Sequence, residues 1–226
     1  PLRELQVTID QLEINGDSAY GYAPLQHAIA KKCGVDPECV VAAAGTSMAN
    51  HLAMAALLDP GDEVLIEQPT YELLTSTLLY LGAAVKTFIR DEDNGYALDP
   101  AEVSRAITPK TKLIVLTNLH NPSSVLASDF VLREIGELAR SVRARVLVDE
   151  VYLDAVYTNP PKTACLLGPE FIVTSSLTKV SGLSALRCAW ILAEPGLARA
   201  LCRRHALVAP PPSPPPARSC LARLDV

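Results

Sequence analysis

The residues of this chain that could carry chemistry are polar ones placed at or just after the ends of apolar segments. Asn121, Asp149, Tyr152 and Lys179 stand in such positions, and Gly45-Thr46-Ser47 opens a segment rich in Ala, Leu and Met. The start of a helix is a natural anion site, because free backbone N–H groups point outward there. Each residue alone also has an ordinary explanation, such as a turn, a helix cap or a solvated lysine. Their shared placement predicts one ligand site.

Seven short apolar segments are predicted to be strands, and helices are predicted between them. The strand segments cover 40–45, 63–68, 85–89, 113–116, 145–148, 171–174 and 188–192. The helical segments cover 23–33, 46–58, 71–81, 99–107 and the stretch from a cap at Ser128 to 142. Apolar strands that alternate with helices are typical of an α/β fold, with a mostly parallel sheet and helices on both faces. In such sheets, ligands bind beyond the carboxyl ends of the strands.

The helix that follows Ser128 carries a regular apolar face. Val131, Ile135, Leu138 and Val142 fall at a 4-3-4 spacing, which places them on one side of an α-helix. We expect this face to pack against the core of the sheet.

Four motifs occur in order along the chain. They are Q-P-T-Y ending at Tyr71, H-N-P-S-S with Asn121, D-E-V-Y from Asp149 to Tyr152, and S-S-L-T-K ending at Lys179, with an arginine eight residues later. On these motifs the chain resembles the class I/II aminotransferases, which are pyridoxal-phosphate enzymes of the aspartate aminotransferase fold. The resemblance implies the large domain of that fold, with the small C-terminal domain largely missing.

The resemblance implies a role for each residue around the cofactor ring. Lys179 would form a Schiff base with the cofactor aldehyde and then act as the general base, since an amine can be both nucleophile and proton carrier. Asp149 would pair with the pyridinium nitrogen and keep the ring an electron sink. Asn121 and Tyr152 would hydrogen-bond the phenolic oxygen of the ring, and Tyr71 would stack on the ring face. Lys179, Asp149 and Tyr152 are the expected catalytic residues.

A second group of residues is implied to bind the cofactor phosphate. Gly45, Thr46 and Ser47 match the family loop that presents backbone N–H groups at a helix start. Ser176 would add a hydroxyl, and Arg187 a charge-assisted hydrogen bond.

Two positions depart from the family pattern. The family commonly has N-P-T-G where this chain has N-P-S-S at 121–124, and Ala189 stands where the family often has glycine. The family's small domain supplies an arginine that binds the substrate carboxylate, and no residue of this chain is assigned to that role. Tyr20 and Tyr22 lie only near the expected place of the tyrosine that reaches the neighbouring subunit in aspartate aminotransferases.

The chain is expected to divide into three parts. Residues 1–19 are predicted to be an incomplete N-terminal segment, 20–205 the pyridoxal-phosphate-binding large domain, and 206–226 a disordered tail. The tail contains P-P-P-S-P-P-P at 210–216, which favours polyproline II and cannot continue a packed domain. Both ends of the chain are therefore expected to be incomplete.

Composition narrows the classes of function. The 226 residues are 49% hydrophobic and carry a formal net charge of -5. A sizeable core is expected, but no basic surface for nucleic acid or for an anionic membrane. No apolar stretch reaches membrane-spanning length, and residues 1–15 lack the apolar segment of a signal peptide, so a cytoplasmic protein is expected. The six cysteines are scattered, which predicts free thiols and no metal site.

The resemblance implies an aminotransferase that moves an amino group from an α-amino acid to a 2-oxo acid with pyridoxal 5'-phosphate as cofactor. These small molecules are the expected partners, together with a second copy of the chain in a homodimer. Three alternatives stay open. They are a lyase or decarboxylase that uses the same lysine, a truncated domain that binds the cofactor without turnover, and a binding module recruited through the proline-rich tail.

Overall fold

The computed structural model of the protein describes residues 22–208 and residue 224, with the backbone alone for 205–208. Within this range one sheet of seven strands has the spatial order β1-β7-β6-β5-β4-β2-β3. The strands are β1 Val40–Ala44, β2 Glu63–Gln68, β3 Ala84–Ile89, β4 Thr111–Thr117, β5 Arg145–Asp149, β6 Phe171–Ser176 and β7 Cys188–Leu192. The predictions for 1–19, for Tyr20 and for most of 206–226 lie outside the described residues.

The sheet is parallel across its centre and antiparallel on one side. β2 pairs in parallel with β3 and β4, and β4, β5 and β6 continue the parallel order. β7 runs antiparallel between β6 and β1. The central strands are apolar on both sides because both faces of the sheet are covered, as in the buried run Leu113–Leu116 of β4. The predicted α/β fold with a mostly parallel sheet is confirmed.

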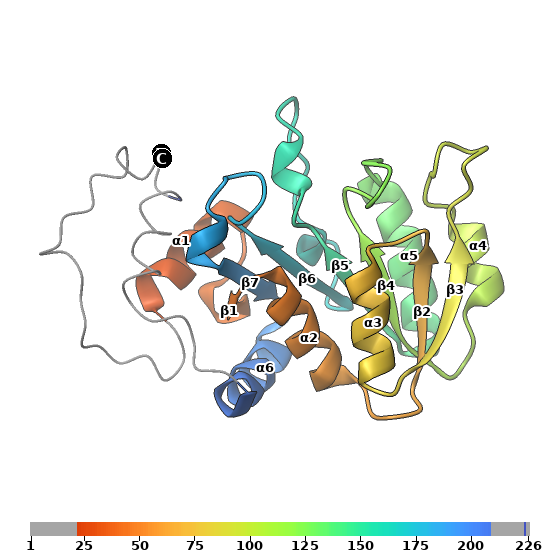
Figure 1. Ribbon diagram of the computed structural model, residues 1–226, viewed down its shortest axis with the longest axis horizontal. Helices are drawn as coiled ribbons and strands as arrows, with labels where there is room; N and C mark the ends of the chain where they lie inside the picture. The colour runs from red at the N-terminus through yellow and green to blue at the C-terminus, as the bar shows by residue number, and fades with distance from the viewer. Residues whose placement is uncertain (1–21, 209–223, 225–226) are drawn as a thin grey trace, which may run out of the picture.

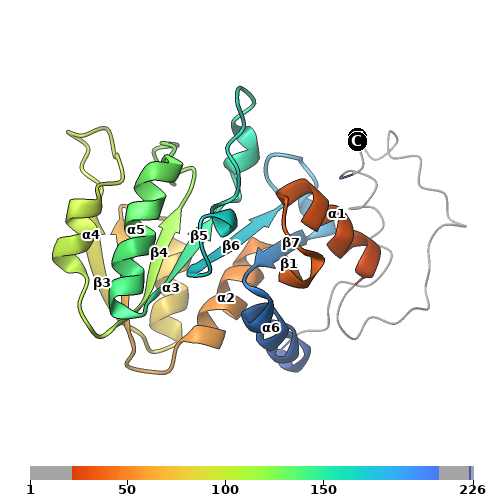
Figure 2. The ribbon, with the colours of Figure 1, turned by 180° about the vertical axis from the view of Figure 1, so that it is seen from behind.

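Helices cover both faces of the sheet. Those described are α1 Ala23–Cys33, α2 Thr46–Leu57, α3 Glu72–Tyr80, α4 Pro100–Ala106, α5 Asp129–Val142 and α6 Pro195–Val208. Helices α2, α3 and α6 lie on the face seen in Figure 1, and α1, α4 and α5 on the face seen in Figure 2. Because side chains alternate along a strand, Val64 and Ile66 of β2 pack on the first face and Leu65 packs on the second.

Helix α5 begins where the sequence predicts, but its buried face is turned by about one residue. The Ser128 hydroxyl accepts a hydrogen bond from the Val131 amide, as a helix cap does. The buried residues of α5 are Leu132, Ile135, Gly136 and Ala139. Val131, Leu138 and Val142 are partly buried and pack against the same core, so the predicted face does contact the core, at its edge. The reason is a close approach at Gly136, where a Cβ atom would lie 2.8 Å from the ring of Phe171 in β6.

Helix α6 and four short 3-10 helices have no counterpart among the predicted elements. The 3-10 helices are η3 Pro37–Cys39, η4 Leu153–Ala155, η5 Ala164–Leu166 and η6 Ser184–Leu186. Helix α6 packs Ala198 and Leu201 into the core beside α2. Every helix in the described range falls short of the length and apolarity that a bilayer crossing needs.

Candidate active site

The carboxyl ends of the central strands border a cavity of about 250 Å³. It is lined by Thr46, Ser47, Asn50, Tyr71, Thr117, Leu119, Asn121, Asp149, Val151, Tyr152, Thr178, Lys179 and Arg187. Eight of the ten residues predicted for the site are among them. The other two, Gly45 and Ser176, contact lining residues directly. The structure therefore brings all ten to one place, and their individual roles stay predictions.

The start of α2 forms one end of the cavity. Gly45, with φ of 92°, joins β1 to α2 and lies against Arg187. A Cβ atom at position 45 would lie 2.0 Å from a guanidinium nitrogen of Arg187, so only glycine lets this guanidinium rest on the loop. The N-terminus of α2 and the guanidinium are both electropositive and face the same space, a suitable arrangement for an anion.

Hydroxyl groups complete this end of the cavity. The Thr46 hydroxyl donates to the Ser176 hydroxyl at 2.9 Å, and Ser176 shares a further hydrogen bond of 2.7 Å with Thr178. These three side chains come from α2, from the end of β6 and from the loop after it. The linked hydroxyls join the helix start to the segment that carries Lys179.

Asp149 is a buried carboxylate in the wall of the cavity. One oxygen accepts from the Asn50 side chain at 2.7 Å and the other from the Val151 amide at 3.0 Å. The Asn50 carbonyl in turn accepts from the Thr174 hydroxyl at 2.6 Å. Burial raises the pKa of Asp149 to about 6, although these hydrogen bonds and the charge of Lys179 act in the opposite direction. Within the described residues the carboxylate has no ion pair, so it is suited to a cationic ligand atom.

Lys179 also lines the cavity and is accessible. It follows β6 and is exposed, whereas the residues before it are buried. Tyr152 and Tyr71 line the same space from the loop after β5 and from the start of α3. A small molecule in the cavity would meet an amine, a carboxylate and two phenol rings.

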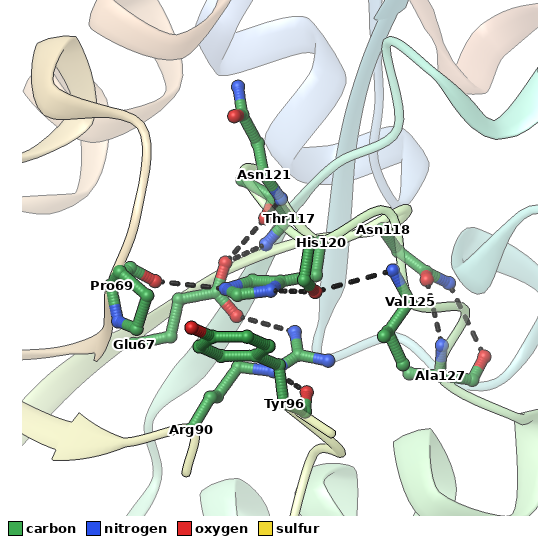
Figure 3. A network of polar contacts seen from close by, with 11 residues as sticks. Glu67, Pro69, Arg90, Tyr96, Thr117, Asn118, His120, Asn121, Val125 and Ala127 are labelled. Carbon is green, nitrogen blue, oxygen red and sulfur yellow. Dashed lines mark hydrogen bonds and ion pairs between the residues drawn. The ribbon is translucent and has the colours of Figure 1, made fainter. Parts of the chain in front are cut away.

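The loop with Asn121 is held by side chains of its own neighbours (Figure 3). The Asn118 side chain accepts from the Ala127 amide at 3.0 Å and donates to its carbonyl at 3.4 Å. His120 Nε2 donates to the Pro69 carbonyl at 2.9 Å. Ser124 has φ of 64°, in the left-handed region that favours glycine. Ser124, at the position where the family commonly has glycine, thus adopts a backbone conformation that glycine favours.

Sequence reasoning missed three polar residues of the cavity wall. Asn50 stands four residues after Thr46 in α2, on the same side of the helix, and that spacing was an available signal. Thr178 directly precedes Lys179 inside a motif already singled out. Thr117 is the last residue of β4, a position where ligand-binding side chains are expected in a parallel sheet. The described residues contain no group of three or more side chains suited to a metal ion.

The fold and the sequence together define the class of protein. Residues 9–222 match the family model of aminotransferase class I and II. This chain belongs to that family, and its fold is the large domain of the aspartate aminotransferase fold.

Individual relatives show how much of the family's length is present. The chain is 30% identical over 160 residues to a probable aspartate/prephenate aminotransferase of Thermus aquaticus, covering 68% of this chain and 42% of that protein. It is 34% identical over 145 residues to a probable N-succinyldiaminopimelate aminotransferase of Mycobacterium tuberculosis, covering 61% and 36%. A crystal structure of a PLP-dependent aminotransferase from Streptococcus suis superposes with a TM-score of 0.90 at 25% identity, covering 99% and 60%. The chain thus spans less than two thirds of each of these proteins.

Proposed function

We propose that this chain is the pyridoxal-phosphate-binding part of an aminotransferase, which moves an amino group from an α-amino acid to a 2-oxo acid. The observation that carries the proposal is the meeting of an accessible amine at Lys179, a buried carboxylate at Asp149 and an anion site at the start of α2 in one cavity. Membership of the family supports the reaction, and the Streptococcus suis neighbour supports the cofactor.

The donors present fit both charged ends of pyridoxal phosphate. A phosphate is suited by the start of α2 at Gly45, by the hydroxyls of Thr46 and Ser47 and by the Arg187 guanidinium. At the other end, a protonated ring nitrogen would supply the positive charge that the buried Asp149 lacks. When bound, the cofactor would supply an aldehyde that condenses with amines and a ring that withdraws electrons from the amino acid.

The protein residues would then bind, orient and move protons. Lys179 would form the covalent bond and carry the α-proton of the amino acid, since an amine can serve in both roles. Asp149 would stay ionised beside the ring cation, because an opposite charge lowers the pKa of a carboxyl. Asn121 and Tyr152 would hydrogen-bond the ring oxygen, and Tyr71 would pack on the ring face.

A spectrum followed by chemical trapping tests this proposal. Pyridoxal phosphate is added to the protein, the visible absorption is recorded, and the sample is reduced with borohydride and mapped by peptide. We expect a reduced adduct on Lys179 and none in Lys179→Ala, with Lys162→Ala, an exposed lysine outside this cavity, as the matched control. An adduct that persists undiminished in Lys179→Ala would refute the assignment.

The loaded protein also separates the alternative reactions. Mixed with α-amino acids, a transaminase releases a 2-oxo acid in a half-reaction, whereas a decarboxylase releases carbon dioxide. A domain that binds the cofactor without turnover gives an adduct and no product. For a transaminase, Asp149→Asn should keep the cofactor bound and slow proton removal, so unchanged half-reaction rates in that variant would contradict the role of Asp149.

We propose further that the protein forms a homodimer. Leu73, Leu79 and Tyr80 of α3 are exposed, and they continue from Tyr71 at the cavity edge. Large apolar side chains that are exposed on one helix favour a subunit contact there. Sedimentation velocity tests the proposal, and a monomer at micromolar concentration would contradict it.

We propose a cytoplasmic location because the described cysteines form no disulfide bonds. The five described cysteines, Cys33, Cys39, Cys165, Cys188 and Cys202, all carry free thiols. Free thiols are usual in a reducing compartment. Cell fractionation with an antibody against the protein tests this location, and recovery in a secreted fraction would contradict it.

A further inference from the structure

A buried ion pair lies beneath the loop that carries Asn121 (Figure 3). Glu67 stands near the end of β2 and Arg90 directly follows β3. Both side chains are at most 1% exposed, and Arg90 Nη1 lies 2.9 Å from Glu67 Oε2. Neither residue lines the cavity, so any effect they have on a ligand passes through other residues.

The second oxygen of Glu67 extends the contact toward the cavity. Glu67 Oε1 accepts from the Thr117 amide at 2.7 Å and from the Thr117 hydroxyl at 2.5 Å. With its proton directed at Glu67, the same hydroxyl oxygen accepts from the Asn121 amide at 2.9 Å. Thr117 is also paired in register with Asp149 on the neighbouring strand. One continuous series of hydrogen bonds thus runs from Arg90 to the backbone of Asn121.

The energetics of this ion pair argue for a role beyond stability. Removing two charges from water is unfavourable, and apolar replacements of buried ion pairs are often at least as stable. The contacts of Arg90 offset its desolvation only in part, because its Nη2 atom is buried without a hydrogen-bond partner among the described residues. The ion pair instead fixes the orientation of the Glu67 carboxylate. Arg90 is held by the Tyr96 carbonyl at 2.8 Å, and Glu67 can then orient Thr117.

We propose that Glu67 and Arg90 are positioning residues that hold Thr117 and, through its hydroxyl, the backbone of Asn121. The Asn121 side chain points away from Glu67 in Figure 3 and lines the cavity. When the backbone of Asn121 is fixed, its side-chain carboxamide keeps one orientation, in which it can donate to the ring oxygen of pyridoxal phosphate. The inference rests on the proposed function, since it assigns a purpose to the geometry around that cofactor.

The consequence is measurable in the colour of the loaded protein. A hydrogen bond from Asn121 to the ring oxygen favours the ionised form of the chromophore and lowers the pH at which its visible absorption changes. When the Asn121 backbone loosens, that hydrogen bond weakens and the midpoint rises. One neutral hydrogen bond corresponds to roughly half to one pH unit. The other titratable or charged groups around Asn121 are the same in every variant below; they are Tyr71, Arg90, His120, Asp149, Tyr152, Lys179 and Arg187. Glu67, whose own pKa burial raises to about 7, is absent only from Glu67→Gln, so Thr117→Val, which keeps it, separates its titration from its positioning role.

The experiment titrates the visible absorption of the protein loaded with pyridoxal phosphate. Glu67→Gln removes the charge without opening a void, and Thr117→Val removes only the hydroxyl. Thr117→Ser restores the hydroxyl. Glu63→Gln is the matched control, because Glu63 accepts from Thr108 and Thr111 and pairs with Lys86 at the opposite end of the same strand.

We expect the midpoint to rise by about half a unit or more in Glu67→Gln and Thr117→Val, and to stay at the wild-type value in Thr117→Ser and Glu63→Gln. If Glu67→Gln does not fold, Thr117→Val alone carries the test, since it keeps the ion pair. Variants that lose thermal stability but titrate at the wild-type midpoint would show a merely structural role and overturn the inference. An equal rise in Glu63→Gln would overturn it too. A wild-type protein that forms no adduct would instead refute the proposed function.

Discussion

Replacement of Glu150 by glutamine is expected to remove a large pH-dependent loss of stability. Glu150 follows Asp149 at the end of β5 and is 3% exposed. One carboxylate oxygen accepts from the Ala164 amide at 2.7 Å. Burial raises the pKa of Glu150 from its ordinary value of 4.5 to about 8, and the nearby charges of Asp149 and Asp154 add to the effect. At pH 7 the Glu150 carboxyl is therefore mostly neutral in the folded protein, whereas it is ionised in the unfolded chain.

The sign and size of the effect follow from this difference. A carboxyl with a raised folded-state pKa contributes stability that is full below pH 4.5 and is lost as the pH rises through about 8. Moving one pKa over that interval is worth at most about 5 kcal/mol. Glutamine keeps an oxygen for the Ala164 amide and carries no proton to lose. The variant should match the wild type near pH 4.5 and exceed its stability increasingly up to pH 9.

Urea unfolding at pH 5, 6, 7, 8 and 9 measures this difference. The buried carboxyls Asp149 and Glu67, whose pKa values burial also raises, are present in both proteins, so the difference between the two curves isolates Glu150. The control is Glu38→Gln, an exposed carboxylate that forms an ion pair with Arg199. Its effect should stay within about 1 kcal/mol. Parallel pH profiles for the wild type and Glu150→Gln would refute the reasoning.

Three further substitutions have effects that differ in kind. Gly45→Ala should displace the Arg187 guanidinium and weaken pyridoxal phosphate binding by about tenfold or more, because a charge-assisted hydrogen bond is lost; fluorescence titration measures it. Asn50→Ala should cost about 1–3 kcal/mol of unfolding free energy, since Asp149 loses a buried donor. That loss should be greater at pH 8 than at pH 5, where the carboxyl is protonated. Gly136→Ala should cost about 1–3 kcal/mol by overpacking β6 and leave cofactor binding unchanged, as paired thermal melts and titrations will show.

The strands and the residues at their ends were predictable because local sequence determines them. Continuous apolar runs between helices have few alternatives to buried parallel strands, and Asp149 follows one such run directly. Once the sheet is parallel, its topology alone gathers Asn121, Asp149 and Lys179 at one edge. The order of residue types within each motif is what makes the chain resemble the family.

The supporting contacts were not predictable, because they join residues that are far apart in the chain. Asn50 and Asp149 are separated by 99 positions, and Glu67 and Arg90 by 23. Nothing in the local sequence distinguishes a buried glutamate with a partner from an exposed one in a strand. The turned face of α5 has a similar origin, because it depends on Phe171 of β6 meeting Gly136 across the packing interface.

The place of β7 in the sheet has a consequence for how the protein is made. β1 pairs with β7, so Val40 meets Leu192, about 150 residues later. During synthesis on the ribosome the parallel strands β2 to β6 can associate as they emerge, because each new strand finds a neighbour already present. β1 can join the sheet only after β7 has been synthesised, and Gly45, which directly follows β1, takes its place at the same time. The loop at Gly45, which is proposed to bind the cofactor phosphate, is therefore expected to reach its final structure last.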